Sequence, residues 1–314
     1  CLGKLCSMIN LLQEKNTFSN KAIISTDSDP YYYFFLPLVA LMWTKMKYQA
    51  NIFLVGEEKY WLNGYRKFII DETLKNGGNV HLIDTGSKER KQILKGYGDG
   101  VIAQVSRFLP FQMKGIKNTD YCLTSDIDMI PIDNDWFYQG GRSKPDIFYA
   151  NGYNHTRYAV CYLGMKSEVW KQVVSIKDEN IYQTINKMLV GLPRNSSKRR
   201  EWGYDETWLY KKIRKFPQYP HSFNMIDRRI YRNPRFKHGM HGTPELLPEG
   251  RLDRSNWNFN EDTVGLIDAH CKRPGFSPAN WPEIKKLMKK FITPEELNSI
   301  QRYYDAFIER HNYV

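Results

Sequence analysis

Short apolar runs alternate with longer segments of helical spacing along the first part of the chain. The apolar runs are bounded by polar residues and predict buried strands at residues 21–27, 51–56, 80–84 and 121–125. Apolar residues that recur every three or four positions predict helices at residues 31–48, 60–76 and, in part, 88–109. Strands and helices that alternate at this spacing are typical of an α/β fold with a doubly wound, largely parallel sheet.

The pattern is less regular after residue 135. Strands are expected at residues 148–150 and 159–163, and helices at residues 167–174, 205–215 and 281–312. Residues 228–262 are rich in Arg, Asn, Pro, Gly and His and form a long predicted loop. A loop of that length in a compact domain is usually functional or disordered.

Two aspartates, Asp126 and Asp128, follow directly after the fourth apolar run. On extended backbone their side chains would face the same side, about 6.6 Å apart. Open α/β sheets bind ligands at the carboxyl ends of their strands, and paired carboxylates suit Mg²⁺ or Mn²⁺. A metal held there would neutralise a diphosphate and assist its departure. A solvated loop is the alternative, because Asp-x-Asp is a common sequence.

The residues around these aspartates resemble the glycosyltransferases of the GT-A fold. Residues 106–111 read SRFLPF and residues 117–128 read KNTDYCLTSDID, which is most similar to the glycogenin-type branch, where an Arg-bearing helix precedes the strand and its Asp-x-Asp. No narrower family is identified. The resemblance runs over about residues 20–275. It implies a GT-A-like, Rossmann-like α/β fold with a mixed, mostly parallel sheet flanked by helices, followed by a C-terminal helical segment.

This resemblance also implies roles for residues of the donor site. Asp128 would ligate the metal directly, and Asp126 would bind the metal, the donor ribose, or both. Thr26 and Asp27, at the end of the first strand, would lie near the base. Arg107 would lie close to the donor; a surface salt bridge is the alternative role for it.

A third metal ligand is expected from a segment far along the chain. Residues 266–275 read LIDAHCKRPG, an apolar run that ends in His270. They resemble the late His, Gly and Lys-Pro segment of glycogenin-like enzymes, although the order differs. Neutral imidazole is a competent ligand beside carboxylates, and Lys272 or Arg273 would hold the diphosphate oxygens. His238 and His241 are the rival candidates.

The acceptor side is expected at residues 201–208, EWGYDETW, where Asp205 and Glu206 start a helix. Acids in a first helical turn commonly serve only the helix dipole. The segment nevertheless resembles the acidic motif that GT-A enzymes place against the acceptor hydroxyl, where a carboxylate is the general base in inverting members. The sequence leaves open which acid acts and with which stereochemistry. Asn151 is a weaker donor-sugar candidate, because Asn151 and Gly152 also read as a hairpin turn.

The 314 residues carry a net charge of +12, which favours anionic partners. A nucleic-acid-binding basic protein is therefore one alternative function, and the paired acids leave a metal-dependent nucleotidyltransferase as another. No zinc-finger or RNP-like motif is present, so nucleic acid is not expected as a partner, and no P-loop is present. A basic predicted helix with lysines at 285, 286, 289 and 290 leaves open a peripheral membrane contact.

The five cysteines are sparse and odd in number, which favours a reducing compartment such as the cytoplasm. The sequence starts with Cys rather than Met, so a removed anchor and a Golgi-lumen location stay open.

The prediction is therefore a metal-dependent hexosyl- or pentosyltransferase with Mn²⁺ or Mg²⁺ as cofactor. It would use a UDP-sugar, or secondarily a GDP-sugar, and a hydroxyl of a glycan or glycoconjugate acceptor. One catalytic domain is expected at residues 20–275, with a nucleotide-sugar half at 20–135 and an acceptor half at 136–275. A polar extension at residues 1–20 precedes it, and a C-terminal helical segment at residues 276–314 follows.

Overall fold

The computed structural model describes residues 18–94, 96–137, 147–149, 157–175, 180–192, 203–219, 221–225, 250–254, 257, 263 and 266–311. Its described strands form a seven-stranded sheet in the order β3-β2-β1-β4-β7-β6-β8 and a three-stranded sheet in the order β5-β10-β9. In the large sheet β7 alone runs against its neighbours, among the strands described. The predicted fold class, a mixed and mostly parallel sheet flanked by helices with a C-terminal helical segment, is confirmed.

The strands of the large sheet are β1 (Asn20–Thr26), β2 (Gln49–Gly56), β3 (Asn79–Asp84), β4 (Tyr121–Thr124), β6 (Ile147–Tyr149), β7 (Leu163–Lys166) and β8 (Phe223–Met225). Those of the small sheet are β5 (Met129–Pro131), β9 (Arg251–Leu252) and β10 (Asp268–His270).

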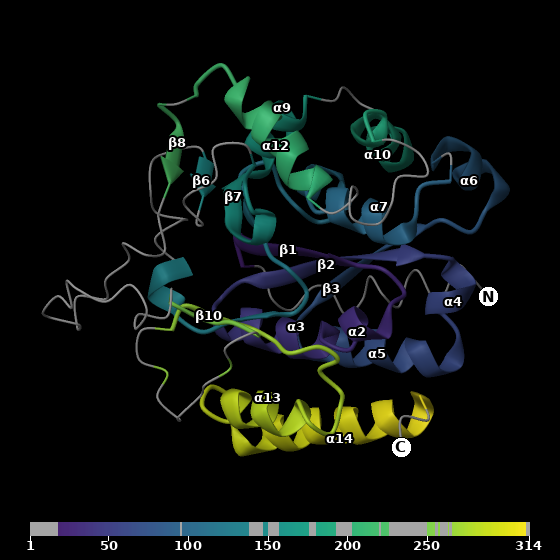
Figure 1. The fold of residues 1–314 in the computed structure, drawn as a ribbon, viewed down its shortest axis with the longest axis vertical. Helices are drawn as coiled ribbons and strands as arrows, with labels where there is room; N and C mark the ends of the chain where they lie inside the picture. The colour runs from purple at the N-terminus through teal and green to yellow at the C-terminus, as the bar shows by residue number, and fades with distance from the viewer. Residues whose placement is uncertain are drawn as a thin grey trace, which may run out of the picture.

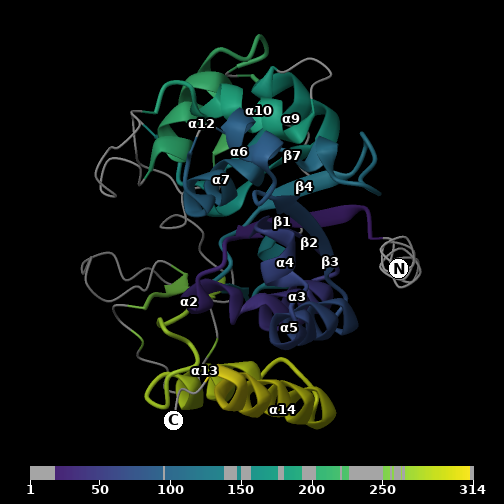
Figure 2. The same ribbon diagram turned by 90° about the vertical axis from the view of Figure 1, so that its right-hand side faces the viewer.

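Helices cover both faces of the large sheet (Figures 1 and 2). On one face lie α6 (Lys88–Leu94), α7 (Asp99–Ser106), α9 (Ser167–Val174), α10 (Ile181–Leu189) and α12 (Tyr204–Arg214). On the other lie α2 (Pro30–Tyr33), α3 (Leu36–Lys45), α4 (Glu58–Trp61) and α5 (Gly64–Lys75). The helices α13 (Trp281–Met288) and α14 (Pro294–His311), yellow in both views, form an outer layer beyond α3 and α5. No described helix is both long and apolar enough to cross a bilayer.

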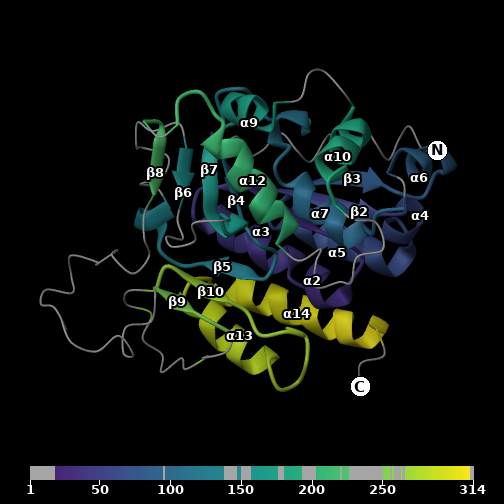
Figure 3. The ribbon, with the colours of Figure 1, turned by 45° about the horizontal axis from the view of Figure 1, so that its top comes forward.

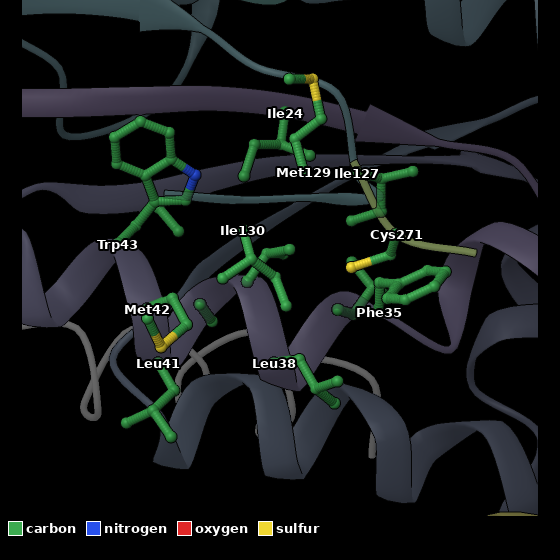
Figure 4. Close-up of a cluster of buried hydrophobic side chains, with 14 of the residues drawn as sticks. Ile24, Phe35, Leu38, Leu41, Met42, Trp43, Ile127, Met129, Ile130 and Cys271 are labelled. Atoms are coloured by element: carbon green, nitrogen blue, oxygen red, sulfur yellow. The ribbon is translucent and has the colours of Figure 1, made fainter. Parts of the chain in front are cut away.

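Alternate residues of the central strands supply two hydrophobic cores. Ile24 and Leu54 face the helix α3 side, where Trp43 and the residues around Cys271 complete the cluster (Figure 4). Ile23 and Phe53 face the opposite core, which α7, α9 and α12 cover. A parallel strand buried on both faces reads as a continuous apolar run, and this is why the first strands were predictable.

Two of the predicted helices are each divided into two in the structure. The segment 31–48 forms two helices, since Pro37 lies in the first turn of α3, where its missing N–H costs little. The segment 281–312 also forms two. Thr293 and Glu296 begin α14 with a reciprocal pair of hydrogen bonds, of 2.7 and 3.3 Å, that satisfies N–H groups at the helix start.

The strand predicted at 159–163 is wrong. Residues Val160–Tyr162 form a 3-10 turn, and β7 begins only at Leu163. The Thr124 hydroxyl exchanges hydrogen bonds with the backbone of Leu163 at 3.1 and 3.2 Å, which fixes the point where the two strands meet.

A glycine is required where β7 meets β4. A methyl group at position 164 would overlap the buried hydroxyl of Tyr121 and lie 3.1 Å from a methyl of Leu123. We expect Gly164→Ala to lower the free energy of unfolding by about 1–3 kcal/mol, because overpacking forces neighbouring groups to move. Gly64→Ala, where a methyl group meets no atom within 4 Å, is the matched control and should change it by less than about 0.5 kcal/mol. Denaturant unfolding of both variants measures the difference, and equal midpoints would contradict the assigned packing.

Candidate active site

The order in which the chain adds strands to the sheet reverses between β1 and β4, although the two strands are parallel. From β1 the chain builds β2 and β3 on one side, and β4 then pairs with the other side of β1. In open α/β sheets, ligands bind outside the carboxyl ends of the strands at such a reversal. A cavity of about 590 Å³ lies there, lined by residues that follow both strands, including Asp27 and Asp126.

One wall of the cavity follows β1. Thr26 and Asp27, which were predicted to lie near a donor base, both line the cavity. The Asp27 carboxylate accepts a hydrogen bond from the backbone N–H of Asp29 at 3.1 Å. Burial raises the pKa of Asp27, and the nearby charge of Asp99 adds to the shift.

The Asp-x-Asp segment is a turn and not extended backbone, which corrects the expectation that both carboxylates face the same way. The Met129 N–H donates to the Asp126 carbonyl at 3.3 Å, because the chain leaves the large sheet at Thr124 and enters the small sheet at Met129. The two carboxylates consequently have different partners. Asp126 pairs with Arg107, whereas Asp128 faces His270, Arg254 and Arg273.

Arg107 connects the two sides of the cavity. One Nη contacts the Asp126 carboxylate, and the other donates to Asp205 at 3.0 Å. Burial alone would lower the pKa of Arg107, but the two carboxylates outweigh it and raise the pKa, so the guanidinium stays charged. The alternative of a surface salt bridge is wrong, because Arg107 is only 8% exposed.

The small sheet brings Asp128 beside His270. Strand β5 pairs antiparallel with β10, and the Cys271 N–H donates to the Asp128 carbonyl at 2.8 Å. Figure 3 shows β5, β9 and β10 side by side near α13. This pairing joins residues that lie about 140 positions apart in the chain and places His270 Nε2 3.4 Å from Asp128 Oδ2.

Asp128 is surrounded by cationic side chains. Its Oδ2 lies 3.2 Å from Arg273 Nε and 3.6 Å from Arg254 Nη2, as well as near His270. The side chain is 4% exposed, and this oxygen accepts no hydrogen bond from any described residue. A buried carboxylate oxygen without a hydrogen bond is unusual and marks a place where a ligand atom would be stabilised.

Asp128 and His270 suit a divalent metal. A carboxylate oxygen and an imidazole nitrogen 3.4 Å apart are compatible with binding one ion. Asp253 lies 3.3 Å from His270 Nδ1, a partner that orients the ring with Nε2 toward Asp128. The pKa of His270 is raised, since Asp128 outweighs the opposing effect of burial, so metal binding would release a proton. Within the described part of the chain, no three His, Cys, Asp or Glu side chains form a ready metal cluster.

The acceptor-side acids begin α12, where Gly203 precedes the helix in a left-handed conformation, φ 81°. Both Asp205 and Glu206 line the cavity, but they differ in environment. Asp205 is buried and held by Arg107. Glu206 is 23% exposed and lies 3.4 Å from Arg157. Burial and the neighbouring charge of Asp205 raise the pKa of Glu206 to about 7.

The remaining predicted residues divide into three groups. Arg273 lines the cavity, whereas its rival Lys272 does not. Asn151, His238 and His241 lie outside the described residues. Arg251 and Arg254 line the cavity and were not predicted. Their only signal in the sequence was the density of Arg in the long predicted loop.

The sequence matches no family model and no curated protein. Among solved structures, the glycosyltransferase GlyE of Streptococcus pneumoniae TIGR4 is similar at 11% identity and a TM-score of 0.39, over 67% of this chain and 46% of that one. The chain thus spans less than half of the GlyE structure. The galactosyltransferase LgtC in complex with donor and acceptor sugar analogues is similar at 11% identity and a TM-score of 0.43, over 90% of this chain and 99% of that one. Both TM-scores are below 0.5, so these similarities do not establish a function for this chain.

Proposed function

We propose that the chain is a glycosyltransferase that moves a hexosyl or pentosyl group from a nucleotide-diphosphate donor to a hydroxyl acceptor. The observation that carries this proposal is one cavity with two chemically different poles. One pole gathers Asp128, His270 and Arg273, which suit a diphosphate and a divalent metal. The other holds Glu206, a carboxylate with a pKa near neutrality. Group transfer between two bound substrates needs both poles within one cavity.

The donor side of the proposal uses residues of both sheets. Thr26 and Asp27 would contact the base, with UDP as the preferred nucleotide and GDP as the second. Asp128 and His270 would hold Mn²⁺ or Mg²⁺, and Asp126 would bind the metal or the ribose. A bound metal ion would stabilise the charge on the departing diphosphate.

The acceptor side separates the two acids by role. Asp205 is locked by Arg107 in a buried pair, so its charge serves to position the guanidinium and, through it, Asp126. Glu206 also lines the cavity, but its cationic neighbour, Arg157, is exposed and not buried. We therefore assign Glu206 as the general base that accepts the proton of the acceptor hydroxyl.

The cavity favours this function over nucleic-acid binding. Its lining includes six carboxylates, from Asp27, Asp29, Asp126, Asp128, Asp205 and Glu206. Unscreened carboxylates repel a phosphate backbone, whereas a metal-bound nucleotide matches a cavity with mixed charges. The net charge of +12 does not decide between the two functions, because charge alone does not distinguish a nucleotide from a nucleic acid.

Thermal unfolding across a panel of nucleotide sugars, with and without Mn²⁺, tests the proposal. A ligand that binds only the native state raises the midpoint, by roughly 3–6 °C at about 100 times its Kd. We expect one UDP- or GDP-sugar to produce a shift that is larger with Mn²⁺. No shift with any donor, together with a salt-sensitive shift with RNA or DNA, would overturn the proposal in favour of nucleic-acid binding.

A further inference from the structure

Four arginines line the cavity, and two of them are already neutralised. Arg107 lies between Asp126 and Asp205. Arg251 donates two hydrogen bonds of 2.7 Å to the fully buried carboxylate of Asp268. A bidentate pair of this kind fixes the orientation of the guanidinium, and the carboxylate neutralises its charge. These two arginines therefore contribute shape and rigidity rather than charge for a ligand.

The other two, Arg254 and Arg273, are in a different position. They converge from separate segments on one oxygen of Asp128, at 3.6 and 3.2 Å, and that oxygen accepts no hydrogen bond from the described residues. A guanidinium carries five N–H donors in a fixed fork. Two guanidiniums that share a single carboxylate keep donors and charge for a ligand in the cavity.

Both guanidiniums are also held in place. Arg273 lies over the ring of Tyr32, 4.6 Å from its centre, and Arg254 contacts the imidazole of His270. Their side chains are partly exposed, so a ligand in the cavity can reach them without unfolding the segment. A positioned pair of forks matches the oxygens of a diphosphate, since each can donate two parallel hydrogen bonds to phosphate.

We infer that Arg254 and Arg273 form a guanidinium pair that binds the diphosphate of the donor directly, so that nucleoside diphosphate binding persists in weakened form without a divalent metal. This inference rests on the proposed function and adds Arg254 to its binding residues. Pyrophosphate oxygens, and not the base or the sugar, are the atoms that the pair recognises.

The position of Arg254 gives the inference a second consequence. Its Nη2 contacts His270 Nε2, the nitrogen that faces Asp128 and that a metal ion would use. A guanidinium beside two metal ligands repels a divalent cation. Removal of Arg254 should therefore weaken diphosphate binding without metal and strengthen metal binding without nucleotide, two effects of opposite sign.

Isothermal titration calorimetry of the full chain tests both effects. UDP and GDP are titrated separately in EDTA, with UMP and GMP for comparison, and Mn²⁺ is titrated into nucleotide-free protein. For Arg254→Gln we expect about 10- to 100-fold weaker binding of the diphosphate that the parent protein binds, and a much smaller change for the monophosphate. Mn²⁺ should bind several-fold more tightly. Arg273→Gln should likewise weaken diphosphate binding in EDTA. Arg302→Gln, an exposed residue of α14 outside the cavity, has the same charge change and should leave every constant unaltered.

The outcomes separate this inference from the proposed function. Binding of UDP or GDP only with Mn²⁺ would overturn the guanidinium pair and leave the proposed function intact. Undiminished diphosphate binding in EDTA by both folded glutamine variants would do the same. Binding of neither diphosphate under any condition would overturn the proposed function and this inference with it. Thermal unfolding of each variant identifies any loss that comes from misfolding.

Discussion

Asp128→Asn is expected to abolish metal-dependent binding of the nucleotide-sugar donor and to lower turnover by about 10³-fold or more. Asp128 is the carboxylate that β5 places beside His270, and its Oδ2 is buried and accepts no hydrogen bond from the described residues. Asp128 would act by holding the proposed metal, and loss of one preorganised group that stabilises charge in the transition state typically costs 10²- to 10³-fold. Because the variant also removes a proposed metal ligand, the larger end of that range applies. Donor binding with and without Mn²⁺, followed by steady-state rates, measures the effect.

The fold should survive this substitution. Asparagine has nearly the same volume as aspartate, and the guanidiniums of Arg254 and Arg273 are partly exposed, so water replaces the lost charge. We expect a loss of about 1 kcal/mol in the free energy of unfolding. Asp135→Asn is the matched control, since it makes the same charge change at an exposed position after β5. Normal Mn²⁺-dependent turnover in Asp128→Asn would contradict the proposed mechanism.

The central strands were predictable because burial on both faces leaves a plain mark in the sequence. The run at Ile23 and Ile24 is apolar at every position since one side chain faces each core. The same reasoning failed at Val160, where apolar residues fill a core from a 3-10 turn. Hydrophobicity records that a residue is buried, and it does not record the backbone conformation that buries it.

Several residues that line the cavity could be predicted from the sequence, but the contacts between them could not. The aspartates stood out because they end a buried strand. Their divergence did not, since it depends on Met129 joining a second sheet whose partner strand comes about 140 residues later. Arg107 was a candidate, but its bridge between Asp126 and Asp205 requires three segments to meet. Arg254 could not be predicted beyond the high Arg content of its loop, because nothing local in the sequence marks a side chain that contacts a histidine in a distant segment.

Those pairings connect the proposed donor and acceptor poles mechanically. Asp126 and Asp205 share Arg107, so the charge of each carboxylate affects how strongly the other is held by one buried guanidinium. Glu206 follows Asp205 in the first turn of α12, and the charge of Asp205 contributes to the raised pKa of Glu206. The pKa of Glu206 is therefore raised by burial and, in part, by the carboxylate that Arg107 joins to Asp126.

Glu206→Gln is expected to lower kcat/KM by about 10²- to 10⁴-fold, the usual contribution of a positioned general base. The pKa of Glu206 is raised to about 7 by burial and by Asp205, so the carboxyl is mostly protonated at pH 6 and ionised at pH 8. A base acts when ionised. The parent rate should therefore rise with pH and level off above about 7, and this step should disappear in the variant. Rates measured between pH 5.5 and 8.5 test it, and an undiminished step near pH 7 in the variant would contradict the assignment of Glu206 as the base.

The pH dependence of stability provides a second, independent measure of the pKa of Glu206. The folded pKa of Glu206, about 7, lies above its ordinary value of 4.5, so the native state binds the proton more tightly than the unfolded state. Stability from this group is present below pH 4.5 and is lost as the pH rises through 7, by about 3 kcal/mol in all. Glu206→Gln should therefore unfold at a higher temperature than the parent at pH 8 and at a similar temperature at pH 4.5. Glu309→Gln, an exposed residue of α14, should show no such difference between the two pH values. A variant that retained the pH step in the rate would show that Glu206 is not the base, and one that gained no stability at pH 8 would show that its pKa is not raised in the folded protein.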